Sequence, residues 1–499
     1  MERWSYISLL FVALLFGSTQ QLRSAEGALR LRLNCKAAIE CGAISKGDTI
    51  AIKGFTWGEL STAPLSYGIV KGRSIILTLQ NAKCGEYVVE LRRRAGGSSG
   101  VSAEDGSNGA SAEDGSNGAS VEDGSSGASA EGGRVRNVME FFVSDAESHR
   151  EEKYAISYKN DAFYAQALEG AAENGLLAEL NASIRDYAAG KIGNGRAKEA
   201  LDSIYSKALA SDSSALFTSL CRLSLDNRCR SVRYIRSVLP LEDPRVLYTN
   251  FVKSSVESYL KSLERNSTEA LTFIAEDLVQ SAHSTLKPYI ALQIFNLFKE
   301  AEIMGQEAVA VEIAKRYLLN DKSGSIEEML GYETYFGIMA FVQMNEHSLI
   351  GMQAPQIELP DSLGCLHSIP QCGEGANGTS PFLQLFYFYT SNCSSCRATT
   401  PLLAELLQRY SGIPIKIYAI FTGSSRGEWM SECAKFSLIK NPLVERIDLW
   451  DPEVESNFPL LYGVISTPQM LLTTDKGIIV GRRLTPKSLE QLLEAINEN

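Results

Sequence analysis

The stretch LQLFYFYT, residues 383–390, constrains the fold of this chain more than any other. Its apolar side chains run without polar alternation, which is typical of a strand that is buried on both faces of a sheet. The runs IKIYAIFT, RIDLW, QMLLTT and GIIVGRR follow it, with helical patterns between them and a final helix after Thr485. We therefore expect an α/β domain over residues 346–499, with helices on both faces of its sheet.

Two cysteines follow this strand directly in the sequence NCSSC, and a helical pattern begins after the first of them. The free N–H groups and the positive end of the helix dipole would then face Cys393 and favour its thiolate. Cys396 would lie one turn further on, where it can resolve a mixed disulfide. We therefore predict a redox pair in which Cys393 is the nucleophile and Cys396 is the resolving thiol.

Other uses of a C-x-x-C pair are weaker. A zinc site needs two further ligands, and the sequence has neither a second C-x-x-C nor an H-x-x-x-H pair. A structural bridge stays open as an alternative, although a two-residue loop gives a strained, easily reduced disulfide. We expect no metal and no small-molecule cofactor.

The sequence VISTPQMLL, residues 464–472, places a Thr-Pro pair at the start of a later strand. A proline at such a position can form a cis peptide bond, which exposes backbone groups beside the thiols. We predict that the Thr467–Pro468 bond is cis and that this dipeptide contacts Cys393. An ordinary trans proline on an edge strand is the alternative.

The chain has 499 residues, too many for one hydrophobic core, so about two to four domains are expected. Residues 1–25 combine an early Arg with a short apolar run and are predicted to be a secretory signal peptide, with an uncleaved anchor as the alternative. Residues 26–159 alternate apolar and polar positions and predict a small antiparallel β domain. Residues 160–345 carry apolar side chains at helical spacing and predict a helical bundle.

A nine-residue repeat interrupts the predicted β domain at about residues 101–133. The unit SAEDGSNGA occurs twice and is followed by SVEDGSSGA. Such small, polar and acidic residues bury too little apolar surface to offset the entropy of ordering. We therefore predict a disordered acidic loop between two strands.

The motifs of residues 351–499 resemble the thioredoxin fold, in its TlpA/ResA-like periplasmic branch. GMQAPQIELPDSLG is similar to the lead-in of that branch, NCSSC occupies the redox position, and Pro401 the position that kinks the helix. Thr467-Pro468 occupies the cis-proline position. The preceding helical region resembles an uncharacterised domain that precedes thioredoxin domains in exported Bacteroidota proteins, where a small β domain often comes first. The resemblance thus implies three folded domains, β, helical and thioredoxin-like, in a multidomain α+β protein.

The sequence departs from the family pattern around the thiols. The Trp that usually precedes the first cysteine is Asn392, and the dipeptide between the cysteines is Ser394-Ser395. The buried acid of thioredoxin itself would fall at Tyr387, and a tyrosine is no base at neutral pH. Proton transfer to or from Cys396 must then use water or another group.

The resemblance implies a thiol–disulfide oxidoreductase of the periplasm or cell envelope. Exported relatives of this branch are commonly reductants, so we expect the disulfides of exported proteins as substrates and a membrane or periplasmic thiol donor as the source of electrons. The net charge of −11, with no long basic run, argues against nucleic acid as a partner.

Two alternatives differ in class from this function. Thr390-x-x-Cys393 is similar to the Thr-x-x-Cys of peroxiredoxins, which favours a thiol peroxidase, but Phe386 stands where that pattern has a proline. The β and helical regions could also bind a partner, which would make the chain a non-enzymatic cell-envelope binding protein with a vestigial redox domain.

Overall fold

The computed structural model describes residues 28–94, 135–145, 150–229, 236–371, 381–435 and 439–498, which form a mixed α+β protein. The predicted signal peptide and acidic repeat lie outside the described residues. The chain divides into two compact units, Met1–Tyr259 and Leu260–Asn499. Within the described ranges, no helix combines the length and apolar character that crossing a membrane requires.

Two sheets of the first unit share one hydrophobic core. Their strands are β1 (Ala28–Asn34), β2 (Thr49–Thr56), β3 (Glu59–Leu60), β4 (Ser66–Ile69), β5 (Ser74–Gln80), β6 (Gly85–Arg92), β7 (Val135–Val143), β8 (Glu151–Lys159) and β9 (Ala162–Glu169). One sheet has the order β5-β1-β8-β9, and the other has the order β3-β2-β6-β7, with β4 paired to β2. The pairs are antiparallel except for β1 and β8, which run parallel, so the prediction of an antiparallel domain holds only in part.

Strand β9 lies inside the range that the sequence predicted to be helical. It pairs with β8 as an antiparallel hairpin. The turn consists of Asn160 and Asp161, whose φ angles are 50° and 57°. Because Asn and Asp tolerate this left-handed conformation, they favour the tight turn of a two-residue hairpin. The first helix after the sheets therefore begins only at Ala172.

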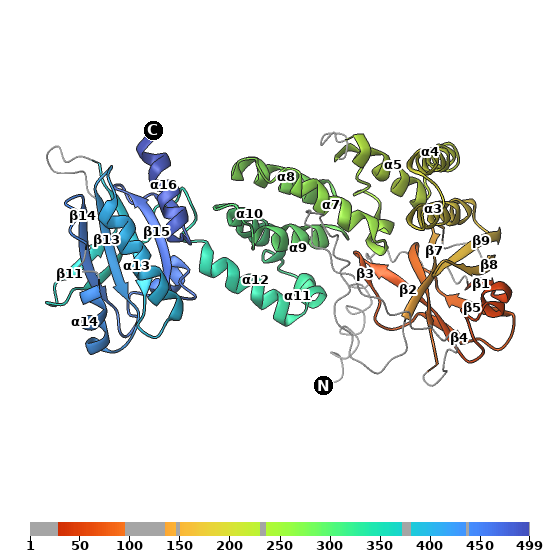
Figure 1. The fold of residues 1–499 in the computed structure, drawn as a ribbon, viewed down its shortest axis with the longest axis horizontal. Helices are drawn as coiled ribbons and strands as arrows, with labels where there is room; N and C mark the ends of the chain where they lie inside the picture. The colour runs from red at the N-terminus through yellow and green to blue at the C-terminus, as the bar shows by residue number, and fades with distance from the viewer. Residues whose placement is uncertain are drawn as a thin grey trace, which may run out of the picture. The chain divides into compact units, whose positions relative to one another are not determined.

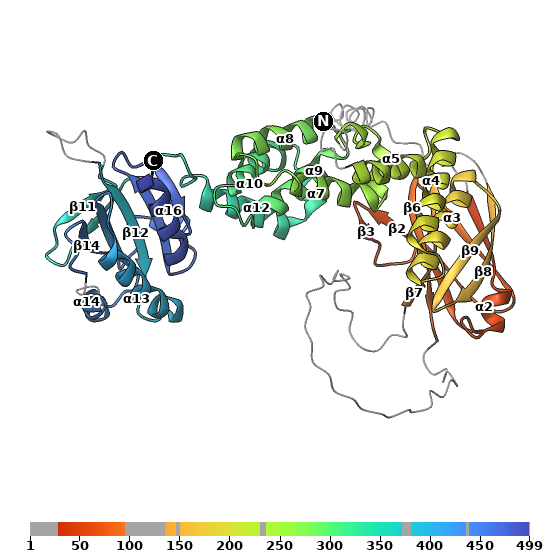
Figure 2. The same ribbon diagram turned by 45° about the horizontal axis from the view of Figure 1, so that its top comes forward.

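The helices of the first unit pack in chain order on the sheets. They are α2 (Lys36–Glu40), α3 (Ala172–Ala188), α4 (Asn194–Ala210), α5 (Leu216–Cys229), the 3₁₀-helix η1 (Pro244–Tyr248) and α7 (Phe251–Lys261), which runs across the boundary of the two units. Helix α3 packs on β7 and β9, α4 packs on α3, and α5 packs on α4 (Figure 2). The helices thus cover a sheet that would otherwise expose apolar side chains.

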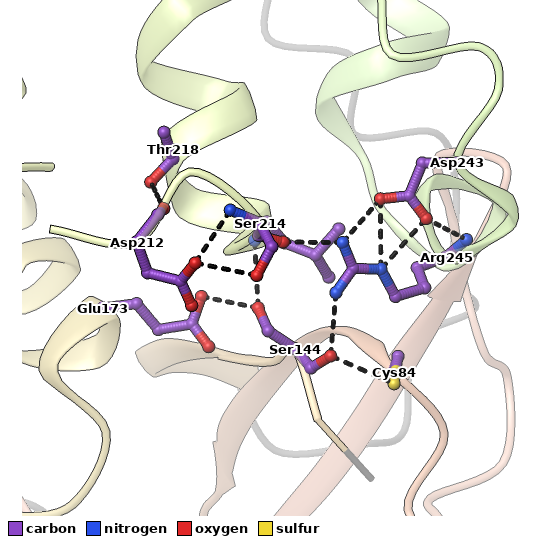
Figure 3. Close-up of polar contacts among 9 residues, drawn as sticks. Cys84, Ser144, Glu173, Asp212, Ser214, Thr218, Asp243 and Arg245 are labelled. Atoms are coloured by element: carbon purple, nitrogen blue, oxygen red, sulfur yellow. Dashed lines mark hydrogen bonds and ion pairs between the residues drawn. The ribbon is translucent and has the colours of Figure 1, made fainter. Parts of the chain in front are cut away.

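Polar contacts around Ser144, just after β7, join the strands of the first unit to its helices (Figure 3). The Ser144 hydroxyl donates to the carboxylate of Glu173, in α3, at 2.7 Å. The Arg245 guanidinium donates to the carbonyl oxygens of Ser144 and Ser214 at 2.9 and 2.6 Å. Asp243 accepts from the same guanidinium at 2.7 Å and caps η1. Arg245 therefore satisfies acceptors from three separate segments.

The second unit contains an α/β part built on a five-stranded sheet. Its elements are β10 (Ile357–Pro360), β11 (Leu366–Ile369), β12 (Leu383–Tyr389), α13 (Ser394–Arg409), β13 (Ile415–Phe421), α14 (Arg426–Lys435), β14 (Val444–Trp450), α15 (Phe458–Tyr462), β15 (Gln469–Thr474), β16 (Ile479–Arg482) and α16 (Pro486–Glu498). The sheet order is β14-β13-β12-β15-β16, with β12, β13 and β14 parallel and β15 and β16 antiparallel. This part matches the predicted alternation of strands and helices (Figure 1).

Strand β12 lies at the centre of this sheet, and all seven of its residues are buried. Tyr387 and Tyr389 belong to the core that includes side chains of α13 and α16. Phe386 and Phe388 belong to the core on the opposite face, with Phe458 of α15. The uninterrupted apolar run therefore reflects a strand covered on both faces, as predicted.

The remaining helices of the second unit precede this sheet in the chain. They are α8 (Thr268–Ser281), α9 (Lys287–Phe298), α10 (Glu307–Ile313), the π-helix η2 (Ala314–Leu318), α11 (Ser325–Leu330) and α12 (Tyr332–Asn345). Helix α10 packs on α8 and α9, and α12 packs on α15. The last helix of the predicted bundle thus contacts the α/β part directly.

Candidate active site

Cys393 occupies the N-terminal cap of α13. Strand β12 ends at Tyr389 and the helix begins at Ser394, so the cysteine lies in the short connection between them, directly before the helix. The Cys393 Sγ atom accepts the backbone N–H of Cys396 at 2.9 Å. The sulfur thereby takes the place of an oxygen cap for one of the free N–H groups at the helix start. It is partly exposed.

The Thr467–Pro468 dipeptide lies against the same sulfur. Its peptide bond is cis, and β15 begins at the next residue. The Cys393 thiol donates to the carbonyl oxygen of Thr467, and the two atoms are 3.1 Å apart. The structure therefore brings the four predicted site residues together, although Cys393 and Thr467 are 74 positions apart in the sequence.

Hydrogen bonds to Cys393 decide its protonation. Burial by itself raises the pKa of this thiol. Hydrogen bonds from the Cys396 thiol, from the backbone N–H groups of Cys396 and Ser395, and from the Thr467 side chain act in the opposite direction. They prevail, so the pKa of Cys393 lies below its ordinary value, because the charged sulfur gains more from these donors than it loses by desolvation.

Cys396 has the opposite character. It is buried, and burial together with the neighbouring Cys393 sulfur raises its pKa to about 11. The backbone N–H of Thr390 and the side chain of Thr467 offset this only in part. The pair therefore combines an accessible sulfur that ionises easily with a sheltered sulfur that stays protonated until the second exchange. The first is suited to attack a disulfide, and the second must lose its proton before it can resolve the mixed disulfide.

Tyr387 occupies the position at which the family resemblance leads one to expect a buried acid. It is fully buried, and its hydroxyl lies 2.8 Å from that of Thr400. Burial raises the pKa of Tyr387, and the nearby sulfurs of Cys396 and Cys393 raise it further. The phenol therefore stays protonated at neutral pH and accepts no proton from Cys396.

Thr390, the threonine of the Thr-x-x-Cys pattern, lies close to the resolving thiol. Its backbone N–H interacts with Cys396. Within the described ranges, no group of three or more His, Cys, Asp or Glu side chains is arranged to hold a metal ion. The two sulfurs and the Thr467 carbonyl group beside them have a geometry suited to thiol–disulfide exchange.

Sequence reasoning missed two features close to the sulfurs. One is the Tyr387–Thr400 hydrogen bond, which the helical spacing after Cys396 could have indicated. The other is a cavity of about 810 Å³ that includes Pro468 in its lining and extends to α9 and α12. No local pattern indicates that these helices approach the cis-proline loop.

Comparisons with known proteins give neighbours in structure alone. No family model matches the chain, and no protein of curated function matches it. A thioredoxin-like protein from Bacteroides caccae is 11% identical with a TM-score of 0.36, over 48% of this chain and 82% of that one. The thioredoxin domain of a thiol-disulfide oxidoreductase from Bacteroides vulgatus is 19% identical with a TM-score of 0.25, over 30% and 97%. A thiol:disulfide interchange protein from Bacteroides sp. is 21% identical with a TM-score of 0.25, over 31% and 93%.

Proposed function

We propose that the chain is a thiol–disulfide oxidoreductase of the exported, TlpA/ResA-like kind, which reduces disulfides of exported proteins. The observation that carries this proposal is the unequal state of the two sulfurs. Cys393 is partly exposed with a lowered pKa, whereas Cys396 is buried with a pKa of about 11. The sheet of three parallel and two antiparallel strands, with the sulfurs at the start of the helix after its central strand, supports a thioredoxin-like fold for this part.

The reaction proceeds by two exchanges. The Cys393 thiolate attacks one sulfur of the substrate disulfide, so that a Cys393–substrate disulfide forms and the other substrate sulfur leaves as a thiolate. Cys396 then loses its proton and attacks the Cys393 sulfur, which releases the second substrate thiolate. Two electrons pass from the protein dithiol to the substrate, whose two thiolates take up protons, and the protein ends with a Cys393–Cys396 disulfide.

A dithiol donor must then return two electrons to that disulfide. We assign this step to a membrane or periplasmic thiol protein, and we place the reaction in the periplasm or cell envelope. The predicted signal peptide at residues 1–25 supports this location. The chain itself then needs no small-molecule cofactor, because the sulfurs carry the electrons.

Reduction of insulin by dithiothreitol tests the proposal. The purified protein should accelerate the precipitation of the insulin B chain, and Cys393→Ser should abolish the acceleration. Cys396→Ser should retain a trapped disulfide to insulin, whereas Cys433→Ser, which alters a partly buried thiol of another helix, should act as wild type. Equal acceleration by wild type and Cys393→Ser would refute the proposal. Rapid consumption of hydrogen peroxide, with a sulfenate on Cys393 and no insulin reduction, would favour the peroxidase instead.

A further inference from the structure

A groove lies beside the reacting sulfur, within the unit Leu260–Asn499. Its volume is about 810 Å³. Side chains of α9 and α12 form one wall, including Phe295 and Phe341, whose rings meet edge to face at 5.2 Å. The cis-proline loop forms the opposite wall, with Ile465 and Pro468. Elements from the helical region and from the α/β part thus enclose one space.

The groove is continuous with the site of exchange. Ser466 and Pro468 line it, and they flank Thr467, whose carbonyl oxygen lies 3.1 Å from the Cys393 sulfur. Thr399, one turn of α13 beyond Cys396, lines it as well. An extended chain advances about 3.3 Å per residue. A substrate cysteine joined to Cys393 therefore places its neighbouring residues at this groove.

The lining favours an apolar side chain from that substrate. Ile465 is 73% exposed on the loop itself, so a bound substrate chain would remove its apolar surface from water. Phe295 and Phe341 line the same cavity. Lys299 and Arg483 contribute cationic groups to the lining, partly balanced by Glu300. An apolar centre with charged groups around it is the usual composition of a site that binds polypeptide.

Buried polar contacts hold the wall of the groove in place. The Arg482 guanidinium, in β16, donates to Glu307 of α10 at 3.1 Å and to Asn345 of α12 at 3.0 Å. Arg483 donates to the same Asn345 oxygen at 2.8 Å. Arg482 and the two residues that it joins, Glu307 and Asn345, are each at most 6% exposed. The helices are therefore fixed against the sheet, and the groove exists before a substrate arrives.

We propose that this groove receives the extended segment next to the reacting cysteine of a protein substrate, and that it prefers an apolar side chain there. Helices α9 and α12 would thus set the substrate preference of the sulfurs. The inference rests on the proposed function and deepens it, because it names the class of disulfide that Cys393 attacks most readily.

A glycine in the wall offers a direct test. Gly337 of α12 is exposed and lines the groove, and a Cβ atom there would meet no atom within 4 Å. Gly337→Trp therefore fills the groove without a clash at the backbone. Gly195 of α4 is equally open and exposed but belongs to the other unit, so Gly195→Trp is the matched control. Ile465→Ser removes an exposed side chain from the opposite wall and is a second variant with little effect on folding.

Three disulfides serve as substrates for the reduced protein. Two are disulfide-linked peptides of equal length, with Leu or with Ser on both sides of the cysteine, and the third is glutathione disulfide. Burial of one leucine side chain predicts that wild type reduces the Leu peptide about tenfold faster than the Ser peptide. Gly337→Trp and Ile465→Ser should both remove this difference. Reduction of glutathione disulfide should stay within about twofold, and Gly195→Trp should match wild type.

The outcomes separate the two proposals. Equal rates of wild type on the two peptides would overturn the groove inference and leave the proposed function intact. The same would follow if Gly337→Trp slowed glutathione disulfide as much as the Leu peptide, because the substitution would then act on the sulfurs. A wild-type protein that reduces none of the three substrates would overturn the proposed function and the inference with it.

Discussion

At the scale of single residues, Thr467 acts on Cys393 through two groups with opposite effects. Its carbonyl oxygen accepts a hydrogen bond from the Cys393 thiol at 3.1 Å and thereby favours the protonated form. Its side chain acts in the other direction and lowers the pKa of Cys393. Because the carbonyl group stays when the side chain is changed, the two effects can be separated by substitution.

Thr467→Val should raise the pKa of Cys393. The variant keeps the shape of the side chain and loses the donor, and a hydrogen bond of about 1 kcal/mol corresponds to about fivefold less thiolate at a pH below the pKa. Alkylation by iodoacetamide, measured against pH, reports the thiolate. In the wild type the rate falls as the pH drops through the lowered pKa of Cys393, and in Thr467→Val this fall should occur at higher pH.

Ser466→Ala is the control for that measurement. Ser466 lies on the same loop and lines the groove, but it is not among the groups that shift the pKa of Cys393. Its profile should overlay that of wild type. If Thr467→Val left the profile in place, the lowered pKa of Cys393 would have to come from the Cys396 thiol and the backbone N–H groups.

At the scale of elements, the buried ion pair between Arg482 and Glu307 is the main polar link from α10 to β16. Both side chains are almost fully buried, and burial lowers the pKa of Arg482 to about 10 in spite of the carboxylate. Removing one member of such a pair leaves the other charge in an apolar interior. The ion pair therefore fixes the position of α10 against β16, and its net contribution to the free energy of unfolding is small.

Arg482→Met should lower the free energy of unfolding by about 3–5 kcal/mol, because the Glu307 carboxylate is left unpaired. The double variant Arg482→Met/Glu307→Met should recover most of that loss, since two apolar side chains can fill the same space. Urea unfolding measures all three proteins. Arg483→Met, which changes an exposed neighbour, should cost less than about 1 kcal/mol. A double variant no more stable than Arg482→Met would show that the pair itself, rather than its unpaired remnant, stabilises the fold.

At the scale of the whole molecule, the sequence predicted what local patterns determine. The buried strand β12 and the helix that begins beside Cys393 follow from periodicity and from the position of the cysteines. Contacts between segments that are distant in the chain have no local sequence pattern that would predict them. Arg482 and Glu307 are 175 positions apart, and nothing in the letters GRR indicates a buried arginine. The predicted β domain ended at residue 159, and the hairpin to β9 depends on the left-handed turn at Asn160 and Asp161, which hydrophobic periodicity does not indicate.

The two compact units should also respond separately to destabilising substitutions. The hydrophobic core between the two β sheets of the first unit (the β sandwich) lies wholly within Met1–Tyr259. Both cores of the α/β sheet lie within Leu260–Asn499. Arg245→Met removes the guanidinium that satisfies Ser144 and Asp243, which should cost about 2 kcal/mol in the first unit alone. Hydrogen exchange at increasing urea concentration measures the protection of backbone amides in each unit separately. Residues 74–80 report on the first unit, and residues 415–421 report on the second.

In Arg245→Met, protection should fall in residues 74–80 and stay unchanged in residues 415–421, and insulin reduction should stay within about twofold of wild type. In Arg482→Met the pattern should be reversed, because its partners all lie in the second unit. Each of the three cores named above lies within one unit. Equal loss of protection in both peptides of either variant would mean that the chain unfolds as one cooperative body, and the stability of the β sandwich would then bear directly on the activity of the sulfurs.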